Sequence, residues 1–168
     1  MQNAKDTFYL MLQGRIAALN PARTVVVRGL VRPGVLVEEN ELNSAAVVPD
    51  AFRLDWSALH VDATLPLPLA TLQCTIRYTT AGSVGNGGMD RGRALAAMDG
   101  ELVAALGLTP KTAPKMNYAA SVGGTAPVAM ATNVFWADPV FGPCEVVGER
   151  LSRTTTVQVM AYQEEGEL

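Results

Sequence analysis

The chain has 168 residues, of which 49% are hydrophobic and 17% are charged, so it is long enough for one domain with a real core and is not intrinsically disordered. The formal net charge of −3, without a basic cluster, argues against nucleic-acid binding as the main function, and we expect no sequence-specific contact with nucleic acid. No apolar run reaches transmembrane length and no secretory signal is visible, so we expect no membrane contact and a protein made and assembled in the cytoplasm.

The first predicted element is a helix that begins at Asp6 or Thr7. Its apolar residues recur at the spacing of one helix face, which predicts burial of Phe8, Met11, Leu12, Ile16 and Leu19. The pair Asn20-Pro21 ends the helix, because a residue that precedes proline disfavours helical backbone angles.

A β-hairpin is predicted next. Residues 23–31 are rich in β-favouring side chains and predict a strand. Residues 32–34 have the composition of a turn, and residues 35–37 predict the return strand. The acidic run at residues 38–41 is interpreted as a solvated loop.

A further strand is predicted before the middle of the chain. Apolar and polar side chains alternate over residues 51–56, and residues 59–61 extend this pattern. Residues 65–69 contain two prolines, which cannot donate hydrogen bonds to a neighbouring strand. We therefore expect an extended connector or a sheet edge there.

The centre of the predicted fold is a strand, a glycine-rich loop and a helix. Residues 72–78 alternate between apolar and polar side chains, as in a half-buried strand, and the loop at residues 79–88 is too rich in glycine for regular structure. A helix is predicted over residues 90–106, and Gly107 and Pro110 end it. Its apolar stripe consists of Ala94, Leu95, Met98, Leu102, Ala105 and Leu106.

The last third of the chain is predicted to contain a long loop, several strands and a tail. Residues 108–132 lack clear periodicity, so we expect a functional or mobile loop. The remaining strands are predicted at residues 133–136, 145–147 and 152–162, with a turn at 138–143. Residues 163–168 predict a frayed acidic tail. Together the elements predict one α+β domain over residues 1–168, with long loops and a mostly antiparallel sheet that carries both helices on one face.

The glycine-rich loop at residues 82–88 has the position of a phosphate-binding loop, between a strand and a helix. However, no Lys-Ser or Lys-Thr pair follows it, and the GxGxxG pattern is absent. Asp90 would also place negative charge beside a bound phosphate. We favour a connecting or assembly loop, and we keep a small ligand-binding or enzymatic domain as the alternative from another functional class.

Patterns for catalysis or metal binding are weak. His60 is the only histidine and lacks a GxSxG or Cys-His signature around it, so we interpret it as a surface or satisfied side chain. Cys74 and Cys144 lie far apart without CxxC spacing. Strand spacing places Asp50 and Asp55 on opposite faces, which does not favour a carboxylate pair. We therefore predict no catalytic residue, no cofactor and no metal.

Four segments carry a resemblance to a known family: residues 74–78 (CTIRY), 89–102 (MDRGRALAAMDGEL), 133–136 (NVFW) and 148–157 (GERLSRTTTV). Together with the preceding helix and hairpin, they resemble the tail terminator (tail completion) proteins of tailed bacteriophages and phage-like particles. The resemblance covers most of the chain in the order of its elements, except for residues 111–132.

The resemblance implies a small α+β structural protein that forms a hexameric ring in the virion. Such a ring sits on the last layer of the tail tube, ends tail polymerisation and offers a surface to the head–tail connector. The implied partners are further copies of the chain, the tail tube protein, the connector or neck protein and, in sheathed tails, the sheath; DNA would pass through the ring. The alternative within this structural class is a neck or head–tail joining protein.

The two long loops, at residues 82–88 and 108–132, are predicted to reach neighbouring subunits or the tube, because their apolar side chains would otherwise face water. The alternative for some of these side chains is that they fold back onto the core of their own chain. Arg91 and Arg93 lie in the first turn of the second helix, where positive charge is unfavourable. We expect them to pair with acidic residues of a neighbour, such as the run at residues 38–41. The predicted interface consists of Gly82, Val84, Gly85, Arg91, Arg93, Met116, Tyr118 and Val122.

Overall fold

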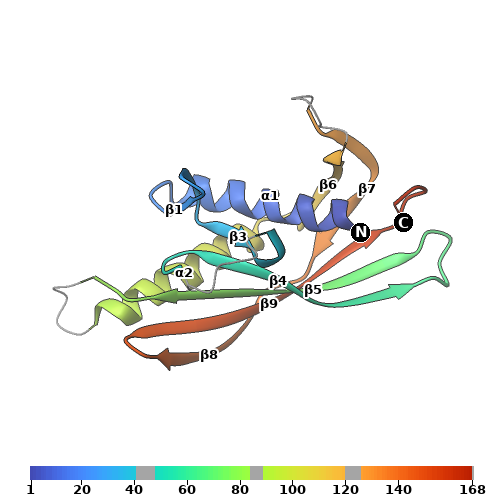
Figure 1. Cartoon of the computed structure of the whole chain (residues 1–168). Helices are drawn as coiled ribbons and strands as arrows, with labels where there is room; N and C mark the ends of the chain where they lie inside the picture. The colour runs from blue at the N-terminus through green and yellow to red at the C-terminus, as the bar shows by residue number, and fades with distance from the viewer. Residues whose placement is uncertain (41–47, 84–88, 120–125, 168) are drawn as a thin grey trace.

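The computed structural model of the chain describes residues 1–40, 48–83, 89–119 and 126–167. Within these residues the fold consists of a large sheet, a separate two-stranded sheet and two long helices (Figure 1). The fold class is α+β, as predicted.

The large sheet has seven strands among the described residues. They are β3 (Val35–Val37), β4 (Phe52–Asp62), β5 (Leu69–Thr80), β6 (Thr112–Asn117), β7 (Val128–Trp136), β8 (Val140–Val147) and β9 (Arg150–Tyr162). Their order is β3-β4-β5-β9-β7-β6, and β8 also pairs with β9. Only the β3–β4 pair is parallel, so the prediction of a mostly antiparallel sheet is confirmed.

The two helices, α1 (Gln2–Leu19) and α2 (Asp90–Gly107), bury one apolar face each in a shared core. The buried hydrophobic side chains are Ala4, Phe8, Leu12 and Ile16 in α1, and Leu95, Met98, Leu102, Ala105 and Leu106 in α2. The helix α1 begins earlier than predicted, because Ala4 extends the apolar stripe by one turn. The predicted burial of Leu19 is wrong: this side chain is 49% exposed, because it lies at the end of the helix outside the core cluster.

The centre of the sheet is the long pair β5–β9. Their register runs without a shift from Leu69 opposite Tyr162 to Thr80 opposite Leu151. The predicted alternation in residues 72–78 is confirmed, because Leu72, Cys74, Ile76 and Tyr78 are all buried in the core. On its other side β5 pairs with β4. Pro66 and Pro68 lie in the connection between these two strands and outside both, as predicted.

Strands β7 and β8 lie one after the other along the same edge of β9. Val134 of β7 is opposite Ala161, and Val140 of β8 is opposite Thr156, so the two strands follow the same direction. They form one long strand that is kinked at residues 137–139. The predicted turn at residues 138–143 is therefore wrong beyond residue 139, because a register shift accommodates the glycine and proline of β8 within the strand.

The predicted hairpin near the N-terminus has a different turn. Strands β1 (Thr24–Val27) and β2 (Leu30–Pro33) form the separate two-stranded sheet, which we call the ribbon. Arg28 and Gly29 connect them with positive φ angles of 52° and 81°, as a two-residue hairpin turn requires. The predicted turn at residues 32–34 is wrong, and the predicted return strand at residues 35–37 is β3, which pairs with β4 instead.

The predicted long loop at residues 108–132 is also wrong in its described part. It contains β6 and the beginning of β7, which pair with each other from Thr112 opposite Phe135 to Asn117 opposite Val128. The sequence signal was weak because β6 contains a proline and a lysine, whose strand preference is low. Pairing with β7 and packing against α1 determine the structure of this segment instead.

The C-terminal segment is not frayed within the described residues. Gln163 donates a backbone hydrogen bond of 2.8 Å to the carbonyl of Pro68. The carboxylates of Glu164 and Glu167 bind to groups of β6, β7 and the N-terminal helix. The prediction of a frayed acidic tail is therefore wrong for the described residues, because the carboxylates of Glu164 and Glu167 attach this segment to the rest of the protein.

Candidate functional site

Three residues of the predicted interface lie together at the start of α2. Gly82 has a positive φ of 72°, and a side chain there would approach the first turn of α2 to under 3 Å. Arg91 donates from Nε to the carbonyl of Ala81 over 3.2 Å, and both Arg91 and Arg93 are exposed. Two other predicted interface residues nearby in sequence lie outside the described residues: Val84 and Gly85.

Met116 and Tyr118 lie against α1. The backbone N–H of Met116 in β6 donates to Oγ1 of Thr7 over 3.0 Å. Burial raises the pKa of Tyr118, and the negative charge of Asp6 raises it further. Both predicted interface residues are half-buried against their own chain, and the third one of this group, Val122, lies outside the described residues.

The structure does not bring these two predicted groups together. Figure 1 shows the beginning of α2 at one end of the molecule and β6 near the other end. If both groups contact neighbours, they belong to separate surfaces.

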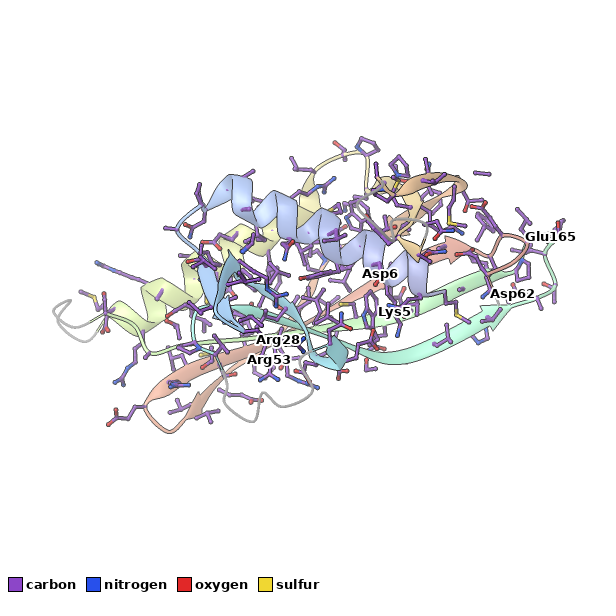
Figure 2. The ribbon with its side chains drawn as sticks, turned by 45° about the horizontal axis from the view of Figure 1, so that its top comes forward. Lys5, Asp6, Arg28, Arg53, Asp62 and Glu165 are labelled. Atoms are coloured by element: carbon purple, nitrogen blue, oxygen red, sulfur yellow. The ribbon has the colours of Figure 1, made fainter. Side chains whose placement is uncertain are left out.

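The acidic run proposed as a partner for Arg91 and Arg93 is already engaged within the chain where it is described. Glu38 lies 3.0 Å from Nη1 of Arg77 and 3.6 Å from Nε of Arg53. Glu39 lies 3.3 Å from Nζ of Lys5. Figure 2 shows Lys5 and Arg53 among the side chains of this region.

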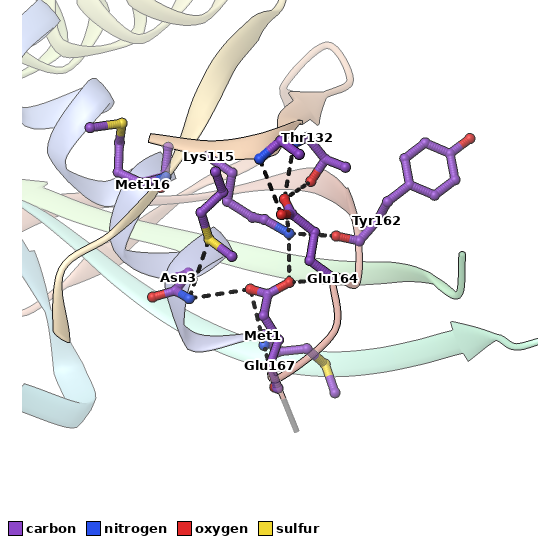
Figure 3. Close-up of polar contacts among 11 residues, drawn as sticks. Met1, Asn3, Lys115, Met116, Thr132, Tyr162, Glu164 and Glu167 are labelled. Carbon is purple, nitrogen blue, oxygen red and sulfur yellow. Dashed lines mark hydrogen bonds and ion pairs between the residues drawn. The ribbon is translucent and has the colours of Figure 1, made fainter. Parts of the chain in front are cut away.

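A polar cluster with many contacts among the described residues surrounds Lys115, which was not predicted from the sequence. Lys115 lies in β6 and is completely buried. Its Nζ donates to the carbonyl of Tyr162 and to Oε2 of Glu167, both over 2.6 Å, and lies 3.3 Å from Oε1 of Glu164 (Figure 3). The available signal was electrostatic: two lysines, Lys111 and Lys115, lie in a segment without acidic residues, and the C-terminus is rich in glutamate.

The two glutamates of this cluster join further elements. Glu164 accepts hydrogen bonds from the N–H groups of Ala131 and Thr132 over 3.1 and 2.9 Å, and from the Thr132 hydroxyl over 2.6 Å. Glu167 accepts one from Asn3 of α1 over 3.3 Å. We call these residues the Lys115 clasp, because they connect the first helix, the β6–β7 hairpin and the C-terminal segment.

The electrostatics of the Lys115 clasp favour its charged state. Burial would raise the pKa of Glu164, but the hydrogen bonds from Thr132 and Ala131 and the charge of Lys115 outweigh it and lower this pKa to about 2. Burial opposes ionisation of Glu167 as well, yet its hydrogen bonds and Lys115 lower its pKa. The lysine is surrounded by acceptors, and its contacts with Tyr162, Glu164 and Glu167 attach the C-terminal segment to β6.

The lowered pKa of Glu164 predicts a pH-dependent contribution to stability. This contribution is complete above the ordinary carboxyl pKa near 4.5 and is lost as the pH falls through about 2. Glu164→Gln is therefore expected to lower the thermal midpoint at pH 7, and the gap to wild type should shrink as the pH falls from 4.5 towards 2. Circular dichroism melts at several pH values measure this gap.

The exposed neighbour Glu165 supplies the matched control, because Glu165→Gln should leave the pH dependence of the melting temperature unchanged. A gap between Glu164→Gln and wild type that stays constant down to pH 2 would show that the Glu164 carboxylate has no special role.

The residues examined for catalysis are dispersed. His60 is exposed on β4, and Cys144 is exposed on β8. Cys74 is buried in the core, where burial, and secondarily the charge of Asp55, raises the pKa of its thiol. Among the described residues, no group of three or more His, Cys, Asp or Glu side chains is arranged to hold a metal ion.

A feature that the sequence analysis missed is the apolar surface on two exposed strand elements. On β8, Val140, Val146 and Val147 are each more than half exposed. On the ribbon, the same holds for Val26, Leu30 and Val31. The β-favouring composition predicted strands at residues 23–31 and 145–147, but which side chains remain uncovered depends on where the helices lie, and no local pattern encodes that.

Comparison with known proteins gives no family assignment: no protein-family model matches the chain, and no curated protein matches it. Within the described part of the chain, neither α1 nor α2 combines the length and apolar character that a membrane-spanning helix needs.

Proposed function

We propose that this chain is a structural protein of a bacteriophage tail or a phage-like particle, and that it forms the ring which caps the tail tube. The ring ends tube polymerisation and presents a docking surface to the head–tail connector. Its partners are further copies of the chain, the last layer of tube protein and the connector or neck protein. It is assembled in the host cytoplasm, becomes part of the virion and performs no catalysis.

The observation that carries this proposal is the exposed apolar surface on β8 and on the ribbon. Single exposed apolar residues are normal on monomers, but groups of them on one element mark contact surfaces. A subunit of a closed ring needs two such surfaces, one for each neighbour. In the part of the chain that the structure describes, β8 and the ribbon supply such surfaces on different elements, in addition to the sequence resemblance to tail terminator proteins.

We also infer that both helices cover the same face of the large sheet. They contact each other through a 2.7 Å hydrogen bond from Nη1 of Arg15 to the carbonyl of Ala105, and they share one core cluster. This leaves the opposite face, which carries the exposed side chains of Gln73 and Gln158, available to the tube or to the lumen of the ring.

The experiment that tests the proposal is negative-stain electron microscopy of the purified protein, alone and mixed with tail tubes, together with light scattering for the mass. We expect six-fold rings and tubes of normal length with a cap at one end. A protein that binds connectors but not tube ends would instead be a neck protein. A monomer that binds neither would contradict the proposal and favour the ligand-binding alternative.

A further inference from the structure

We propose that neighbouring copies of the chain meet head to tail, with the ribbon of one copy seated against β8 of the next. The occupant of each surface is thus a second copy of this chain. This inference rests on the proposed ring and goes beyond it by naming the two surfaces that join its subunits.

The first surface is β8, which pairs with a strand on one side only. Its partner is β9, and among the described residues no strand pairs with its other edge. Its valines are among the most exposed large hydrophobic side chains of the described residues: Val140 is 67% exposed, Val146 is 77% and Val147 is 59%. An exposed apolar edge strand is a template for pairing with another chain. The register places Val146 on one face of the sheet and Val140 and Val147 on the other. The part of β8 that another strand would complete is therefore its free edge, which exposed valines flank on both faces.

The second surface is the ribbon, which pairs with no other strand of the described chain. Val26 is 68% exposed, Leu30 is 68% and Val31 is 69%. A two-stranded hairpin is marginally stable by itself and gains stability from packing against other strands. Val26 and Val31 are opposite each other on one face of the ribbon, and Leu30, which is opposite Val27, lies on the other face. The ribbon therefore has exposed apolar side chains on both faces, like β8, and free edges of its own.

The charges of the two surfaces are complementary. Arg28 at the tip of the ribbon is exposed, and its one described contact is a 3.4 Å hydrogen bond to the carbonyl of Asn40. Glu145 of β8 and Glu149 in the turn after it are exposed and form no ion pair among the described residues. A positive, apolar ribbon and a negative, apolar strand fit each other, and complementary charge fixes the orientation of such a contact.

The backbone of Arg28 gives an independent reason to assign a role to its side chain. Arg28 has a φ of 52°, in the left-handed region that residues other than glycine, asparagine and aspartate adopt reluctantly. Arginine therefore occupies a turn position at which asparagine or glycine would cause less backbone strain. Such strain is typical of functional positions. An arginine that binds the next subunit accounts for it.

The two surfaces lie on different parts of the protomer. Figure 1 shows the ribbon beside α1 and β8 at the far edge of the large sheet. A contact between two different surfaces is heterologous, so it leaves one surface of each type free on every pair of copies. Successive copies then close into the proposed ring when the rotation between neighbours divides a full turn evenly. Contact of β8 with β8 would instead produce a dimer and bring the glutamates of two copies together.

Two charge-reversal variants test the pairing. Variant A carries Arg28→Glu, and variant B carries Glu145→Arg with Glu149→Arg. Each variant alone places like charges at every contact, so we expect monomers at concentrations at which the wild type forms rings. In an equimolar mixture each surface of A is complementary to a surface of B, so rings with alternating subunits are expected to return. Light scattering and electron microscopy, with tail tubes present and absent, measure both effects.

The controls separate assembly from folding. Glu165→Arg reverses an exposed charge at the end of the molecule away from Arg28 (Figure 2) and should leave the rings intact. Arg28→Asn removes the charge but suits the turn, so it should weaken ring formation without lowering the melting temperature.

The outcomes distinguish this inference from the proposed function. If variant A and variant B each still form rings like those of the wild type, the inference is overturned and the proposed function stands. The same holds if the mixture of A and B fails to form rings. A wild-type protein that forms no ring, alone or on tubes, would overturn the proposed function and this inference with it.

Discussion

Replacing Lys115 with alanine is expected to lower the free energy of unfolding by roughly 3–5 kcal/mol, because removal of one partner leaves buried opposite charge without compensation. Lys115 is completely buried, and its Nζ lies 2.6 Å from Oε2 of Glu167. Chemical denaturation followed by circular dichroism measures the change. Lys115→Met retains most of the aliphatic stem, so it separates the loss of charge from the loss of volume.

Lys111 is the matched control for this prediction. It forms an ion pair with Asp138, whose side chain is 78% exposed. An exposed pair contributes roughly 0–1 kcal/mol, so Lys111→Ala should have a small effect. Equal destabilisation by Lys111→Ala and Lys115→Ala would mean that the Lys115 clasp is no stronger than a surface ion pair.

Leu102→Ala is the second substitution with a large expected effect, a loss of roughly 2–5 kcal/mol in the free energy of unfolding. Leu102 is completely buried on the apolar stripe of α2, so the substitution opens a cavity in the shared core. Thermal and denaturant unfolding measure the loss. Val103→Ala, at a neighbouring position that is 53% exposed, should change stability far less.

An unchanged unfolding midpoint for Leu102→Ala would show that the apolar stripe of α2 does not face the core. Because Leu102 lies in the helix and far from β8 and the ribbon in sequence, the variant also tests whether loss of stability by itself prevents ring formation.

The elements predicted correctly are those whose signal is local. The alternation in residues 72–78 and the helical spacing of Met98 and Leu102 each identify a buried face from neighbouring residues alone. The centre of the sheet and the helix α2 could therefore be predicted from the sequence.

The elements that were missed depend on residues far away in the chain. Strand β6 is stabilised by β7 and by α1, and its own composition does not favour a strand. The partners of Lys115 lie about fifty residues later, at Tyr162 and Glu167, so no window of the sequence contains the cluster. In the sequence, the valines of β8 cannot be distinguished from core valines. They are exposed in the structure because neither helix covers them.

The Lys115 clasp also has a consequence for engineering, because it brings the first and last described residues together. The amino group of Met1 lies 3.5 Å from the carbonyl oxygen of Glu167, and Figure 1 shows the two ends side by side. The path of the chain is thus nearly a closed loop. A short linker could join these ends and new ends could be opened in the exposed connection between β4 and β5, a type of site at which circular permutation is well tolerated. Fluorescent or affinity tags at that connection would leave the joined ends undisturbed.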